Sequence, residues 1–189
     1  MLAGQLRTWK RPPHWPASQI GFLKPSVMSE VLDPFPLLRL LDEHGIDHII
    51  VGGFAVNAHG FIRVTKDLDI VPRPSADNLD RLARMLREVE ATILDTEDFS
   101  REELPADPTR ATGLAEGGNF CLLTKAGRLD IMQWLSGVDV EDLYAELNPQ
   151  AIESEIDGLT IRVCGLEHLL AMKRAAGRPQ DLEDLRQLS

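Results

Sequence analysis

The protein has 189 residues, of which 43% are hydrophobic and 26% are charged, and its formal net charge is −10. A chain of this length can bury one sizeable core. No apolar run approaches the ~20 residues that span a bilayer, and the acidic balance argues against broad, non-specific binding of nucleic acid. The two cysteines are too few for a disulfide framework, so we expect a cytoplasmic protein.

Residues 1–27 have the composition of a disordered extension. They contain four prolines and no periodic apolar pattern. The basic residues near the start are not followed by the apolar core of a signal peptide. We therefore predict one domain over residues 28–189, preceded by a disordered extension.

Helices and strands are predicted through the rest of the chain. Asp33-Pro34 marks the start of a helix that ends at Gly45. An apolar strand over 49–51 then leads into a glycine pair and a short helix. The later elements are a strand over 67–71, a helix from Ser75, a strand over 92–94, hairpins over 119–134 and 152–163, and helices over 166–176 and 179–188. Residues 95–117 are expected to be a long surface loop.

Three aspartates are candidates for a metal site. Asp67 and Asp69 are two residues apart on a predicted strand, so both carboxylates should lie on one face of it. Such a pair needs a counter-charge, and Mg2+ binds carboxylate oxygens while keeping positions for substrate phosphates. Asp130, on another strand, could complete a two-ion site. The alternative is an exposed strand face on which Arg63 or Lys66 pairs with the carboxylates.

Gly52 and Gly53 follow an apolar strand and are candidates for phosphate binding. Glycine lets backbone N–H groups approach an oxyanion, and the following helix terminus adds positive charge. The alternative is a tight turn. Four polar residues are further candidates for nucleotide binding: Arg63, Thr65, Lys66 and Lys173. Each also has a structural explanation, and the Lys173 side chain could extend to solvent from a helix stripe that is otherwise apolar.

The combination of the glycine pair, the three aspartates and the spacing between them resembles the DNA-polymerase-β-like nucleotidyltransferase superfamily. The resemblance is in particular to small bacterial members related to AbiEii-type toxins and to antibiotic nucleotidyltransferases. The matching segments are 51–55, 59–60, 67–70, 129–130, 172–173 and 178–182, together with Arg63 and Thr65. The resemblance extends over residues 33–188. It implies an α+β fold, with a mixed β-sheet flanked by helices and a short C-terminal helical segment.

The resemblance also implies an activity, which is transfer of a nucleoside monophosphate from an NTP to a hydroxyl acceptor with release of pyrophosphate. Asp67 and Asp69 would hold Mg2+ and the triphosphate, and Asp130 would bind a second Mg2+ and help to activate the acceptor. Gly52 and Gly53 would contact the phosphates through their backbone. The acceptor stays open among tRNA, a protein and an antibiotic, and a cognate antitoxin or a second copy of the chain is a candidate partner.

Two other functions remain open at this stage. Many active members of the superfamily have Gly-Ser where this chain has Gly52-Gly53. The missing hydroxyl motivates a catalytically degenerate binding or antitoxin-like module. A DxD-dependent phosphatase or glycosyltransferase is the third hypothesis. A haloacid-dehalogenase-type phosphatase places its DxD at the end of an apolar strand, whereas here Ile70 and Val71 follow the pair, which disfavours that class.

Overall fold

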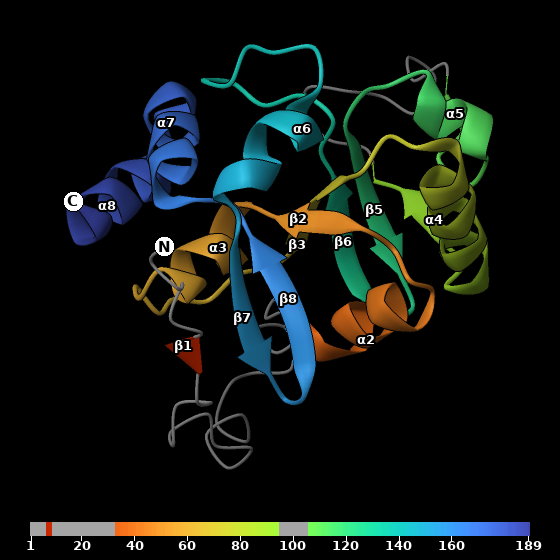
Figure 1. Cartoon of the computed structure of the whole chain (residues 1–189), viewed down its shortest axis with the longest axis horizontal. Coiled ribbons are helices and arrows are strands. Elements are labelled where there is room, and N and C mark those ends of the chain that lie inside the picture. Colours follow the sequence, from red (N-terminus) through yellow and green to blue (C-terminus); the bar gives the residue numbers. More distant parts are fainter. Residues whose placement is uncertain (1–6, 9–32, 95–105) are drawn as a thin grey trace.

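The computed structural model describes residues 7–8, 33–94 and 106–189 (Figure 1). The predicted disordered extension, residues 1–27, lies outside the described residues except for the backbone of Arg7–Thr8, which forms a short strand. The division into an extension and one domain over 28–189 therefore stays a prediction.

One mixed sheet organises the described part of the chain. Its strands lie in the order β1-β7-β8-β2-β3-β6-β5-β4. They are β1 (Arg7–Thr8), β2 (His48–Ile50), β3 (Leu68–Pro72), β4 (Thr92–Ile93), β5 (Phe120–Thr124), β6 (Gly127–Ile131), β7 (Ile152–Ile156) and β8 (Leu159–Val163). The pairs β3/β6, β2/β8 and β1/β7 are parallel, and the remaining neighbours are antiparallel. This confirms the predicted mixed sheet.

Helices flank the sheet, as predicted. They are α2 (Phe35–Glu43), α3 (Gly52–Ala58), α4 (Ala76–Glu88), α5 (Ala111–Ala115), α6 (Leu143–Leu147), α7 (Leu166–Ala176) and α8 (Pro179–Leu188), with a 3-10 turn, η2, at Asn148–Gln150. Figure 1 shows α4 and α5 at one end of the molecule and α7 and α8 at the other. Within the described ranges, no helix combines the length and the apolar character needed to cross a membrane.

The α2 helix illustrates why these residues form these elements. Its start is fixed by Asp33, whose carboxylate accepts a hydrogen bond from the Phe35 N–H at 3.2 Å. Leu37 and Leu41, four residues apart, are fully buried, where the helix packs on β6 and β8. The chain then turns at Gly45 with φ +59°, a conformation that glycine adopts without steric cost. The helix predicted from Asp33-Pro34 to Gly45 is confirmed.

Two short helices were not predicted. Part of the expected loop over 95–117 is the helix α5, because Leu114 is fully buried and therefore provides an apolar anchor. Residues 95–105 lie outside the described residues. The helix α6 starts at Asp142, whose carboxylate accepts a hydrogen bond from the Ala145 N–H at 2.9 Å. The acidic composition of that region concealed its buried face, which Leu143 and Leu147 form.

Candidate active site

The structure brings the three predicted aspartates together. Asp69 on β3 lies directly opposite Asp130 on the parallel strand β6. Asp67 immediately precedes β3, and the Thr65 hydroxyl lies 3.3 Å from Asp67 Oδ1 and donates to the Asp67 carbonyl at 3.1 Å. Their flanking apolar residues, Leu68 and Leu129 among them, are fully buried. The sheet core therefore fixes the backbone that carries the carboxylates.

Burial and mutual repulsion disfavour the ionised forms of two of these aspartates. Burial, and then the charges of Asp67 and Asp130, raise the pKa of Asp69 to about 7, against the opposing effects of Lys173 and the Gly53 backbone N–H. Burial and the charge of Asp67 likewise raise the pKa of Asp130 to about 6. Such a cluster gains stability from a cation.

One carboxylate oxygen of Asp130 has no hydrogen-bond partner within the described part of the chain. Its Oδ1 is buried without a hydrogen-bond partner, while Oδ2 accepts a hydrogen bond from the Cys121 thiol at 3.6 Å. Burial, and then the Asp130 carboxylate, raise the pKa of Cys121 to about 12, so the thiol stays protonated and is a donor. Arg128, two residues earlier on β6, has a buried Nε without a partner and lowers the pKa of Asp130. Sequence reasoning assigned neither Cys121 nor Arg128 to the site, although the period-two alternation of β6 places Arg128 on the same face as Asp130.

Gly52 and Gly53 pack directly against this cluster. A Cβ atom at Gly52, whose φ is +63°, would lie 1.9 Å from Asp69 Oδ2. A Cβ atom at Gly53 would lie 2.6 Å from the Thr65 hydroxyl oxygen. Both glycines are therefore favoured by close approach, and Gly52 is favoured also by its positive φ at the turn into α3. The glycine pair thus lies beside Asp69 and Thr65, and its contact with phosphate stays a prediction.

The segment before β3 is held from two sides. On one side, the side chain of Asn57 in α3 makes two hydrogen bonds to the backbone of Arg63. It accepts from the Arg63 N–H at 2.9 Å and donates to the Arg63 carbonyl at 3.0 Å. On the other side, Asp184 in α8 accepts hydrogen bonds from Arg63 Nε at 2.7 Å and Nη2 at 2.9 Å. Because Thr65 and Asp67 follow at once, these contacts set the position of the first carboxylate.

Five charged side chains form a cluster that joins α7, α8 and this segment, and we call it the α8 charge cluster. Its members are Arg63, Lys173, Arg178, Asp181 and Asp184. Lys173 Nζ lies 2.8 Å from Asp181 Oδ1 and 2.9 Å from Asp184 Oδ2. The two carboxylates are 1% and 0% exposed. Ion pairs therefore link α7, α8 and the segment before β3.

The remaining nucleotide-binding candidates have different surroundings. Arg63 and Lys173 are engaged with buried carboxylates, so their contact with phosphate stays a prediction. Lys173 faces inward rather than to solvent, and its charge opposes the raised pKa of Asp69. Lys66 is exposed in the segment between α3 and β3. Thr65 is buried beside Gly53 and Asp67.

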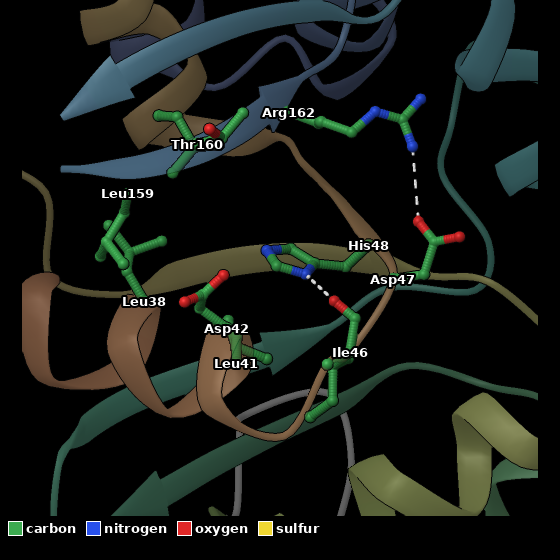
Figure 2. A pocket seen from close by; sticks show the side chains of 11 residues that line it. Leu38, Leu41, Asp42, Ile46, Asp47, His48, Leu159, Thr160 and Arg162 are labelled. Atoms are coloured by element: carbon green, nitrogen blue, oxygen red, sulfur yellow. Dashed lines mark hydrogen bonds and ion pairs between the residues drawn. The ribbon is translucent and has the colours of Figure 1, made fainter.

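A pocket of about 120 Å³ lies away from the carboxylates, between α2, β2 and β8 (Figure 2). It is lined by His48, whose Nδ1 donates to the Ile46 carbonyl at 2.8 Å. Burial lowers the pKa of His48, so the imidazole is neutral. His48 is paired with Pro72, at the far end of β3 from Asp69. The pocket is therefore separate from the carboxylate site.

Comparison with solved structures identifies the fold. The chain is similar to the lincosamide antibiotic adenylyltransferase LnuA with lincomycin bound, at TM-score 0.52 and 15% identity over 84% of this chain and 99% of that one. It is similar to the antibiotic-resistance factor ANT(2'')-Ia, at TM-score 0.50 and 18% identity over 82% of this chain and 79% of that one. TM1012 of Thermotoga maritima, a candidate nucleotidyltransferase, matches at TM-score 0.50 and 17% identity over 84% and 94% of the two chains.

The fold is the nucleotidyltransferase fold. The resemblance inferred from the sequence is thereby confirmed at the level of architecture. No protein-family model matches the sequence, and no curated protein matches it significantly. At these identities the similarity concerns the fold, so an activity has to be argued from the side chains of the site.

Proposed function

We propose that the protein is a nucleotidyltransferase, which moves a nucleoside monophosphate from an NTP to a hydroxyl acceptor and releases pyrophosphate. The observation that carries this proposal is the pairing of Asp69 with Asp130 on adjacent parallel strands. Asp67 adjoins the pair, and the Gly52 backbone packs against Asp69. This arrangement supplies carboxylates for a cation, with the glycine pair that we propose contacts the phosphates directly beside them.

The side chains present fit Mg2+. Three carboxylates that repel one another, one of them with a buried and unpartnered Oδ1, are a hard-oxygen donor set. Among residues 33–94 and 106–189, no three His, Cys, Asp or Glu side chains form a ready-made metal cage. Mg2+ does not need such a cage, because it is usually held by one or two carboxylates together with substrate phosphates. Asp67, Asp69 and Asp130 would hold one or two such ions, which would neutralise charge on the triphosphate.

The protein's own contribution is orientation. Asp130, whose Oδ1 has no hydrogen-bond partner among the described residues, would accept a hydrogen bond from an acceptor hydroxyl and aim its oxygen at the α-phosphate. The Gly53 N–H orients Asp69, and Thr65 orients Asp67. Because the sheet and the α8 charge cluster fix these groups before substrate binds, little reorganisation is required at the moment of transfer.

The absence of a serine at position 53 is compatible with activity. A side chain at this position would collide with the Thr65 hydroxyl oxygen, 2.6 Å from the Cβ position. The Thr65 hydroxyl therefore lies beside the position from which a serine side chain would extend. The argument for a catalytically degenerate module is therefore weaker, because the Thr65 hydroxyl lies beside the glycine pair.

We favour a small hydroxyl-bearing molecule as the acceptor. Two solved structures with this fold are an antibiotic adenylyltransferase with lincomycin bound and an antibiotic-resistance factor. The alternative acceptors are tRNA and a protein, as in a toxin–antitoxin role with a cognate antitoxin as partner. The acidic chain, with its net charge of −10, is less suited to a long polyanion than to a small molecule.

A transfer assay tests the proposal. The protein is incubated with Mg2+ and each α-labelled NTP, together with a panel of antibiotics, bulk tRNA or total cell protein. We expect label to move to one of these acceptors with wild-type protein and not with Asp69→Asn. Asp80→Asn, which changes an exposed carboxylate on α4, is the matched control and should transfer normally. Equal transfer by wild type and Asp69→Asn would contradict the mechanism.

A further inference from the structure

The α8 charge cluster carries an unbalanced positive charge next to the carboxylates. It contains three cations (Arg63, Lys173 and Arg178) and two buried carboxylates, those of Asp181 and Asp184, so its net charge is +1. Arg63 and Lys173 form ion pairs with the buried carboxylates, and their side chains are only 17% and 7% exposed. The excess charge therefore lies at Arg178, whose side chain is 74% exposed.

Arg178 is fixed by Asp181, and some of its guanidinium N–H donors have no partner among the hydrogen bonds to Asp181. Its Nε donates to Asp181 Oδ2 at 2.7 Å and its Nη2 lies 3.5 Å from Asp181 Oδ1. The backbone N–H of Arg178 also donates to Asp181 Oδ2, at 3.2 Å, in a capping box that starts α8. A guanidinium has five N–H donors, so three remain for another group. An arginine that is fixed in this way loses less entropy when it binds a ligand.

The guanidinium is joined to the carboxylate site through the α8 charge cluster, because Asp181 binds both Arg178 and Lys173, and Arg63 of the same cluster comes four residues before Asp67. The hydrogen bond to Asp181 raises the pKa of Arg178, and the charges of Asp69 and Asp67 raise it further. A triphosphate that approaches Asp67, Asp69 and Asp130 is repelled by their carboxylates, so a cation beside them favours its binding. The planar fork of arginine matches the oxygens of a phosphate group.

We propose that Arg178 is a polyphosphate-binding residue, whose three free N–H donors contact the β- and γ-phosphates of the NTP. This inference rests on the proposed function, since it names the residue that holds the leaving pyrophosphate of that reaction. Asp181 is a positioning residue here, because it holds the guanidinium and itself stays buried.

Binding of nucleotides tests the inference without knowledge of the acceptor. The α,β-methylene analogues of the four ribonucleoside triphosphates, which cannot be cleaved at that bond, and the four monophosphates are titrated with Mg2+ by calorimetry. The variants are Arg178→Gln, which keeps donors for Asp181 but removes the charge, and Arg178→Lys. Arg174→Gln is the control, because Arg174 is an exposed arginine near the end of α7. Thermal melting confirms that each variant is folded.

We expect Arg178→Gln to weaken binding of one triphosphate analogue by about tenfold or more, as for the loss of charge-assisted hydrogen bonds. Binding of the matching monophosphate should change by less than about threefold, Arg178→Lys should recover part of the loss, and Arg174→Gln should bind like wild type. If the wild type binds an analogue and Arg178→Gln binds it equally well, or loses triphosphate and monophosphate equally, the inference fails while the proposed function stands. If the wild type binds none of the analogues, the proposed function fails and the inference with it.

Discussion

Removing the charge of Asp184 should strongly destabilise the protein. Asp184 is 0% exposed and accepts hydrogen bonds from Arg63 at 2.7 and 2.9 Å, while Lys173 Nζ lies 2.9 Å away. In Asp184→Asn, Arg63 and Lys173 lose the negative charge that they share, and water does not replace it because the site is buried. Breaking a buried ion pair from one side costs about 3–5 kcal/mol. Because asparagine keeps one acceptor oxygen, we expect the lower end, about 3 kcal/mol, or about two orders of magnitude in the unfolding equilibrium constant.

Urea unfolding followed by far-UV circular dichroism measures this loss. The matched control is Glu183→Gln at the neighbouring position, which makes the same charge change. Glu183 pairs with Arg186 at 2.7 Å, but the two side chains are 41% and 70% exposed. An exposed pair of this kind contributes little to stability. A loss below about 1 kcal/mol for Asp184→Asn, or one equal to that of Glu183→Gln, would refute the account of the α8 charge cluster.

Three further predictions concern the same regions. Burial alone would raise the pKa of Asp184, but hydrogen bonds from Arg63 and Lys173 outweigh it and hold that pKa below the ordinary value of 3.8. The stability that the Asp184 carboxylate contributes is therefore present above about pH 4 and is lost as the pH falls through the pKa of the folded state. Because Asp184→Asn lacks this contribution, its urea midpoint should fall less on acidification than the urea midpoint of wild type. Asp69→Asn should raise the melting temperature of the protein in EDTA, because it relieves repulsion among three carboxylates, and a lower melting temperature would contradict this. Gly53→Ser should cost about 1–3 kcal/mol by overpacking against Thr65, and Thr65→Ala in the same chain should recover part of it, whereas strictly additive costs would exclude that contact.

Local signals were sufficient for most of the fold. The Asp33-Pro34 start, the turn at Gly45 and the leucines between them predicted α2, because capping and periodicity act within a few residues. The helices α5 and α6 were missed because each is only five residues long. Helices of that length are stable through tertiary burial rather than through local preference. The burial of Leu114 and Leu147 is not visible in the sequence.

The site was predictable where spacing carries chemistry. The spacing of Asp67 and Asp69 pointed to one carboxylate site, and the resemblance added Asp130, which the structure pairs with Asp69. The pairing of Arg63 with Asp184 was not, since it joins residues 121 positions apart. The role of Arg128 likewise depends on burial of its Nε. Local alternation places Arg128 on the same face as Asp130, but its burial and the pairing of Arg63 with Asp184 are determined by tertiary packing.

The central claim is that Asp130 and its partners act on the α-phosphate of an NTP. The most direct measurement follows α-labelled and γ-labelled NTP in parallel reactions with Mg2+ and the acceptor panel. We predict that α-label moves to an acceptor while γ-label leaves as pyrophosphate, and that Asp130→Asn abolishes both. Release of γ-label as inorganic phosphate, or unchanged transfer by Asp130→Asn, would contradict the account.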